Sequence, residues 1–241
     1  MGYRPYHPEF RAWVDRAFML SRSVVSASLR LGISLWVAGS YMWLGDYGRW
    51  AMVLEELEEM ATSREPLQAI EWRFLKAMAL NQMGPSDQSL LPLVEEGLKL
   101  SSDSGVIVWA PMLLLEGCYG ALDRGDFRKA SDFLAQMESM LGRAPKILDL
   151  RYHGVAALYH FLTGDTRRAV AHARQAITFS PDDVIFFPTA VGYCSSAILL
   201  AATGRAGRGT GKYSCLPAPA ANHEPHTGVY LPDSGGCPGS G

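Results

Sequence analysis

Apolar and charged positions alternate with the period of an α-helix in two segments of the chain, 50–61 and 127–141. In the second segment the apolar residues are three or four positions apart and therefore share one helix face. They are Phe127, Ala130, Leu134, Met137 and Leu141. The first segment repeats this spacing with Trp50, Val53, Leu54, Leu57 and Ala61, opposite the acids Glu55, Glu56, Glu58 and Glu59. Both segments are predicted to be short outer helices with one buried face.

Other segments are apolar on most sides, which is typical of a helix that is surrounded by neighbours. They cover residues 31–44, 106–122, 150–163 and 184–203. We expect them to be inner helices, each paired with the amphipathic segment that follows it.

A two-residue turn separates each apolar segment from the next amphipathic one. It stands at Gly45-Asp46, Gly84-Pro85, Gly125-Asp126, Gly164-Asp165 and Gly204-Arg205, with a period of about forty residues. Glycine adopts the positive φ that ends a helix, and an aspartate that follows can cap the next helix. The pattern predicts stacked helical hairpins.

The predicted fold is an all-α, right-handed solenoid of about five hairpins. The hairpins are expected at residues 23–61, 67–101, 106–141 and 146–180, with a fifth inner helix at 184–203. A helix at 8–21, within an N-terminal segment 1–22, has the pattern of the outer helix of a preceding repeat. The solenoid would therefore span residues 23–204.

Residues 205–241 differ in composition, with eight glycines and five prolines in 37 positions. Such a segment buries too little apolar surface to offset the entropy of ordering, so we expect a disordered tail. It begins where the outer helix of the fifth hairpin should start, which suggests a frameshift or truncation near Arg205. In that case the fifth inner helix would expose Val191, Ile198, Leu199 and Leu200.

The segment 154–181 resembles a tetratricopeptide repeat. Gly164-Asp165 stands at the turn, Ala169 and Ala176 at the small positions of the second helix, and Pro181 where that helix stops. The period of forty is similar to the longer repeats of the MalT-like region in bacterial multidomain transcriptional activators. That resemblance implies a signal-sensing solenoid, here without the ATPase and DNA-binding modules and cut at both ends.

The overall composition favours a soluble repeat domain. The chain has 241 residues, of which 48% are hydrophobic and 19% charged, and a net charge of −2. A near-neutral balance argues against direct contact with nucleic acid. The four cysteines are widely spaced, so a reducing, cytoplasmic location is expected. The N-terminus lacks a signal-peptide pattern, and Arg30 interrupts the best membrane candidate, 24–44.

Three groups of residues resemble chemical sites without matching the pattern that each site requires. The segment 207–214 resembles a phosphate-binding loop, but its glycines enclose three residues and Tyr213 follows Lys212. Four tail residues could supply zinc ligands by type, but their spacing matches no common zinc module: Cys215, His223, His226 and Cys237. The histidines of one hairpin have no nucleophile beside them in the sequence: His153, His160 and His172. No metal, cofactor or catalytic residue is therefore predicted, and the chain is expected not to be an enzyme.

The concave face of the predicted solenoid is the candidate binding surface. Counting back from the turn glycines places Glu71, Phe74, Met78, Asn81, Met112, Leu115, Tyr119, Arg151 and Phe161 on it. The polar or amphipathic members are the candidate ligand contacts: Glu71, Asn81, Tyr119 and Arg151.

We therefore expect a non-catalytic binding scaffold for a protein, a peptide or a small-molecule effector, involved in bacterial signal transduction or transcription regulation. Two alternatives remain open. One is a free-standing peptide-binding adaptor, and the other is a truncated or frameshifted fragment without independent activity. The sequence predicts neither a membrane partner nor a nucleic-acid partner.

Overall fold

The computed structural model describes residues 7–62, 65–83, 88–142, 146–178 and 196–201 of the chain. These residues contain helices and no strand, so the fold is an all-α solenoid. Contacts divide the chain into a unit 1–207, which holds every described residue, and a second unit 208–241. None of the described helices is long and apolar enough to cross a membrane.

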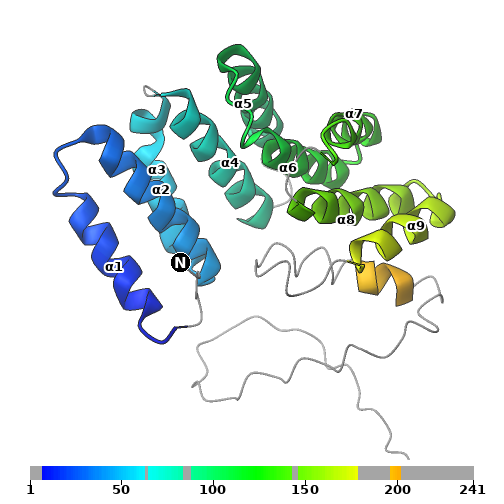
Figure 1. Ribbon diagram of the computed structural model, residues 1–241, viewed down its shortest axis with the longest axis horizontal. Helices are drawn as coiled ribbons and strands as arrows, with labels where there is room; N and C mark the ends of the chain where they lie inside the picture. The colour runs from blue at the N-terminus through cyan, green and yellow to red at the C-terminus, as the bar shows by residue number, and fades with distance from the viewer. Residues whose placement is uncertain (1–6, 63–64, 84–87, 143–145, 179–195, 202–241) are drawn as a thin grey trace, which may run out of the picture. The chain divides into compact units, whose positions relative to one another are not determined.

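Nine helices of the described ranges follow one another in chain order (Figure 1). They are α1 (Phe10–Ser21), α2 (Ala27–Trp43), α3 (Tyr47–Thr62), α4 (Pro66–Met83), α5 (Leu90–Ser104), α6 (Ala110–Asp123), α7 (Phe127–Glu138), α8 (Lys146–Leu162) and α9 (Thr166–Ala176). A short helical segment, 196–201, comes after them.

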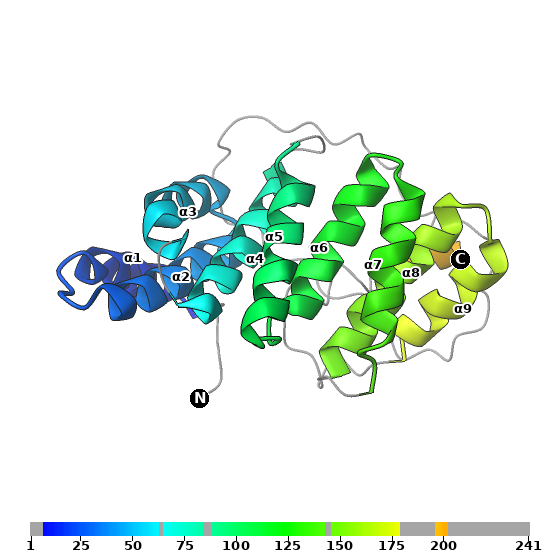
Figure 2. The same ribbon diagram turned by 90° about the horizontal axis from the view of Figure 1, so that it is seen from above.

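The helices pack as hairpins of an inner and an outer member. The closest partners are α2 with α3, α4 with α5, α6 with α7 and α8 with α9, and Figure 2 shows the middle two pairs side by side. Helices α2, α4, α6 and α8 also contact one another in sequence, whereas each outer helix contacts the inner helix that follows it. The even-numbered helices therefore form a continuous inner row, as the apolar segments predicted.

The Gly-Asp turns have the predicted mechanism. Gly45, Gly125 and Gly164 have φ of 70°, 71° and 85°, which a side chain at Cβ would disfavour. After Gly125, the Asp126 N–H donates to the Ala121 carbonyl at 2.9 Å, which satisfies an orphan acceptor of α6. The Asp126 carboxylate then accepts from the Lys129 N–H at 3.0 Å and caps α7.

Helix α6 begins later than the pattern predicted, at Ala110 instead of 106. Gly105, with φ of 74°, ends α5. Pro111 stands in the first turn of α6, where a backbone N–H would have no acceptor within the helix, so the lack of an N–H in proline costs nothing there. Two of the predicted outer helices end early, because α7 stops at Glu138 and α9 at Ala176, whereas α5 continues to Ser104, beyond the predicted 101. Apolar periodicity fixes which face is buried but defines helix ends poorly.

Burial follows the predicted stripes with two exceptions. The stripe of α3 is fully buried, and its four acids are exposed. In α7, however, Phe127 is exposed and the unpredicted Phe133 is buried. The second exception is the segment 196–201, whose predicted exposure holds for Ile198 but is wrong for Leu199 and Leu200. These two leucines pack on a small cluster formed by Ala157, Ala169, Val170 and Ala173.

Several predictions lie outside the described residues. They concern the turns at Gly84-Pro85 and Gly204-Arg205, most of the fifth inner helix including Val191, and the tail 205–241.

Candidate functional site

A buried carboxylate in the middle of the inner row organises the candidate site. Glu116 is the one charged residue of the apolar segment 106–122, and helix α6 places it 5% exposed against α4. The Asn81 side chain on α4 donates through Nδ2 to the Glu116 Oε2 at 2.8 Å and to the Glu116 carbonyl at 3.0 Å. This double hydrogen bond compensates part of the desolvation of the carboxylate.

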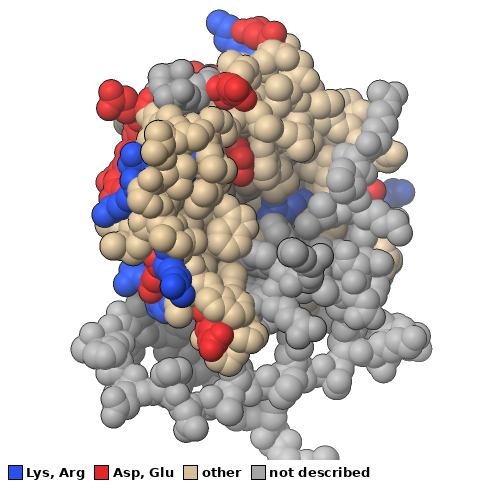
Figure 3. Space-filling model, turned by 60° about the vertical axis from the view of Figure 1, so that its left-hand side comes forward, with Lys and Arg blue, Asp and Glu red and all other residues tan. Residues whose placement is uncertain are grey.

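Arg151 enters the same region from α8. Its neighbours in the sequence, Leu150 and Tyr152, are buried, and the arginine itself is 5% exposed. Its Nη1 donates to the Met112 Sδ at 3.3 Å, while its Nε is buried without a partner. Figure 3 shows one face of the molecule, on which most charged side chains lie at the edges.

The electrostatics of the cluster reflect burial first and charge second. Desolvation raises the pKa of Glu116, although the Asn81 hydrogen bond and the Arg151 charge oppose that rise. Desolvation lowers the pKa of Arg151, against the attraction of Glu116 and Tyr119. Burial also raises the pKa of Tyr119, and the Glu116 charge adds to this effect. We name these four residues, Asn81, Glu116, Tyr119 and Arg151, the inner-face cluster.

The structure thus brings together three of the four predicted contact residues. Glu71 is not among them: it precedes Asn81 by ten residues in α4, about 15 Å along a helix axis. Burial raises the pKa of its carboxyl group. Three apolar positions predicted on the concave face are buried in the core instead, namely Phe74, Met78 and Leu115. Phe74 stacks on Trp109 at 5.2 Å, so core packing accounts for it.

Sequence reasoning missed Glu116, although a signal was present. A single acid in an otherwise uncharged inner helix is expensive to bury unless it has a partner. The prediction named Met112 and Tyr119 of α6 but not Glu116, although Glu116 is four residues after Met112 and three before Tyr119 and so shares their helix face. In the structure it accepts hydrogen bonds from Asn81.

The hairpin of α8 and α9 gathers the three histidines. The Nδ1 atoms of His153 and His172 are 3.0 Å apart, and the rings of His160 and His172 stack with centroids 5.3 Å apart. Desolvation lowers the pKa of all three, that of His172 to about 4. In the described part of the chain, no group of three or more metal-ligand side chains could hold an ion.

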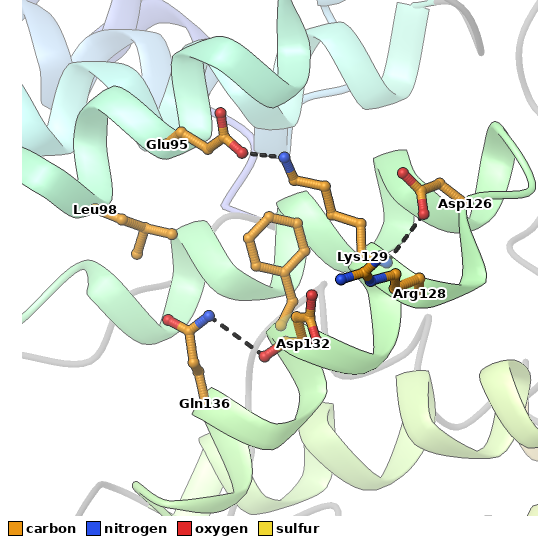
Figure 4. Close-up of a pocket in the computed structure, with 8 residues that line it drawn as sticks. Glu95, Leu98, Asp126, Arg128, Lys129, Asp132 and Gln136 are labelled. Carbon is orange, nitrogen blue, oxygen red and sulfur yellow. Dashed lines mark hydrogen bonds and ion pairs between the residues drawn. The ribbon is translucent and has the colours of Figure 1, made fainter.

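A groove lies on the outer side, between α5 and α7 (Figure 4). It has a volume of about 530 Å³ and is lined by Glu95, Leu98, Asp126, Arg128, Lys129, Asp132, Phe133 and Gln136. Several of its polar groups pair with one another: Lys129 forms an ion pair with Glu95, and Gln136 donates to the Asp132 carbonyl at 3.3 Å. Because these polar groups are exposed to solvent and several already pair with one another, the groove gives no evidence of a ligand site.

Comparison of the chain with family models, curated proteins and solved structures found no match. The resemblance to tetratricopeptide repeats and to the MalT-like region therefore stays a prediction.

Proposed function

We propose that this chain is a non-catalytic binding scaffold, the signal-sensing or partner-docking repeat region of a bacterial regulator. The observation that carries the proposal is the inner-face cluster. Polar and charged groups from α4, α6 and α8 converge in the interior of an otherwise apolar row of helices. Buried polar groups without full compensation reduce stability, so they are expected where binding requires them.

The mechanism of such a scaffold is presentation of a surface. A ligand that contacts three successive inner helices stabilises one relative placement of the hairpins. Among the described helices each hairpin packs mainly on its neighbours, so that placement affects the whole array. Within the cluster, Arg151 and Asn81 would orient the ligand, and Tyr119 would supply apolar contact together with a hydroxyl group. None of these roles requires a nucleophile.

A ligand screen on the full chain tests the proposal. Metabolites and peptides would be ranked by their effect on Tm and confirmed by calorimetry. We expect a ligand that raises Tm of the wild type and loses this effect in the double variant Arg151→Met/Tyr119→Phe. The matched control is Arg128→Met in the exposed outer groove, which should bind as the wild type does. A ligand with unchanged Kd for the double variant would contradict the proposed site.

One observation favours the adaptor alternative. A cavity of about 600 Å³ between α2 and α4 is lined by Ser26, Ser28, Leu29, Gly32, Ile33, Trp36 and Gln68. Trp36 is 49% exposed there, so its indole ring is available to pack against a side chain of a docked peptide. In the same screen, a peptide adaptor predicts that Trp36→Ala abolishes binding while the double variant at the inner-face cluster does not.

A further inference from the structure

The guanidinium of Arg151 is buried, but among the described residues it has fewer hydrogen-bond partners than a buried guanidinium normally requires. Arginine carries five N–H donors and stays charged in proteins, so a buried guanidinium normally has a carboxylate against it. Within the described ranges, no carboxylate lies within 4.0 Å of Arg151, and its single hydrogen bond is to the Met112 sulfur, a weak acceptor. Its Nε has no partner. Glu116 attracts it only at longer range.

The unused donors have a definite geometry. Nε–H and one Nη2–H of a guanidinium are parallel and form a fork, and Nη1, which contacts Met112, lies on the other side. Two parallel donors match the two oxygens of a carboxylate, and such bidentate pairs are the strongest hydrogen bonds arginine makes. We propose that the inner-face cluster binds a ligand through a carboxylate group, which Arg151 holds with its Nε–H and Nη2–H.

This inference rests on the proposed binding function and names the ligand chemistry of the same site. The other members of the cluster have consistent roles. Asn81 directs its two N–H bonds to Glu116 and so holds that carboxylate away from the fork. Tyr119 lies close enough to interact with both charges. A ligand carboxylate in the fork would supply the counter-charge that the described residues do not bring within ion-pair distance.

Glu116 then modulates binding through its proton. A second carboxylate beside Glu116 repels the ionised form of that residue, so binding should favour its protonation. The titratable groups around it are Tyr119 on the same helix and Arg151 on α8, and Asn81 faces it from α4. Affinity for a carboxylate should therefore increase as the pH falls, and Glu116→Gln should remove this dependence.

Simple probes test the inference on the full chain. Tm would be measured in acetate and in chloride at equal ionic strength, with acetamide as the uncharged isostere. N-acetylglycine tests whether the carboxylate belongs to a peptide end or to a small metabolite. We expect acetate to raise Tm more than chloride or acetamide does. A larger gain with N-acetylglycine than with acetate assigns the ligand to peptide termini, and an equal or smaller gain assigns it to a metabolite.

Variants separate binding from structure. Arg151→Met should keep or raise Tm without ligand, since an apolar chain of similar volume replaces an unpaired buried charge, and it should lose the acetate response. Arg151→Lys, which lacks the fork, should bind acetate about tenfold more weakly. Glu116→Gln should bind at least as tightly as the wild type.

Three outcomes would overturn the inference: an acetate effect no larger than that of acetamide, an unchanged response in Arg151→Met, or a marked fall in its ligand-free Tm. The last would show that Arg151 is structural, with buried water satisfying its Nε. A neutral ligand from the screen whose binding depends on Arg151 and Tyr119 would contradict the inference of a carboxylate ligand. It would still support the proposal of a binding scaffold.

Discussion

At the residue scale, burial acts on two kinds of cationic side chain in helix α8 and its partner. The guanidinium of Arg151 stays charged, and the residues that the structure describes offer no acceptor to its Nε. The imidazoles of His153, His160 and His172 instead favour their neutral forms, because desolvation lowers the pKa of each. A neutral imidazole can accept the hydrogen bond that joins the Nδ1 atoms of His153 and His172 at 3.0 Å.

The lowered pKa of His172 predicts a pH dependence of stability. Its folded-state value of about 4 lies below the ordinary 6.5, so the unfolded chain binds the proton more tightly. The free energy of unfolding should therefore fall as the pH decreases from about 6.5 to about 4 and should stop depending on this residue below that. Other charged groups around the three rings are Glu138 on α7, Asp149 on α8, and Asp165 and Arg168 at the start of α9.

Urea unfolding at several pH values measures this effect. His172→Gln should flatten the slope of the unfolding free energy against pH between about 4 and 6.5. Equal slopes in the wild type and His172→Gln would show that His172 is not the residue responsible.

At the scale of the helix, glycines decide how closely α6 approaches its neighbours. A Cβ on Gly117 would lie 2.9 Å from Phe133 on α7 and 2.9 Å from Val94 on α5. Glycine weakens an isolated helix, so its presence here reflects the close contact of three helices. The same close packing seats Glu116, the residue before Gly117, against α4.

Gly117→Ala should therefore destabilise the protein, by about 1–3 kcal/mol, because the added methyl group overpacks the contact. The control is Gly39→Ala in α2, where a Cβ meets no atom within 4 Å. There alanine should raise the unfolding free energy by about 0.5–1 kcal/mol, through its higher helix propensity. Denaturant titration measures both, and a stabilised Gly117→Ala would show that the three helices can separate at no cost.

The sequence predicted helices and turns well because both depend on local patterns. The capping of α7 by Asp126 and the buried face of α3 required only neighbouring residues to be known. The inner-face cluster depends on which residues of α4, α6 and α8 meet, and repeat position alone predicted Asn81 and Arg151 but missed Glu116. Phe74 was predicted on the concave face but is buried, because it stacks on Trp109, which lies 35 positions away in the sequence. This contact too depends on the packing of distant helices.

At the scale of the whole described array, the apolar core is not uniform. One continuous cluster runs from Phe10 to Ala156, whereas α9 packs on a separate, smaller cluster made largely of alanines. In a solenoid each hairpin is stabilised by its own packing and by its neighbours, so an element whose buried side chains are small opens more easily than one with a large apolar face. Helix α9 should therefore open before α2 to α7 do.

Native-state hydrogen exchange tests this order. We expect the amides of α9 to exchange with a lower opening free energy than those of α6. Val170→Ala, in the small cluster, should lower the opening free energy of α9 by roughly 1–2 kcal/mol and leave α6 unaffected. Leu113→Ala, in the main cluster, should instead lower the free energy of the global opening, by about 2–5 kcal/mol. If Val170→Ala lowered protection in α6 as much as in α9, the described helices would unfold as one cooperative unit.

Arg151 lies on α8, the partner of α9, so a ligand held by Arg151 should also slow exchange in α9.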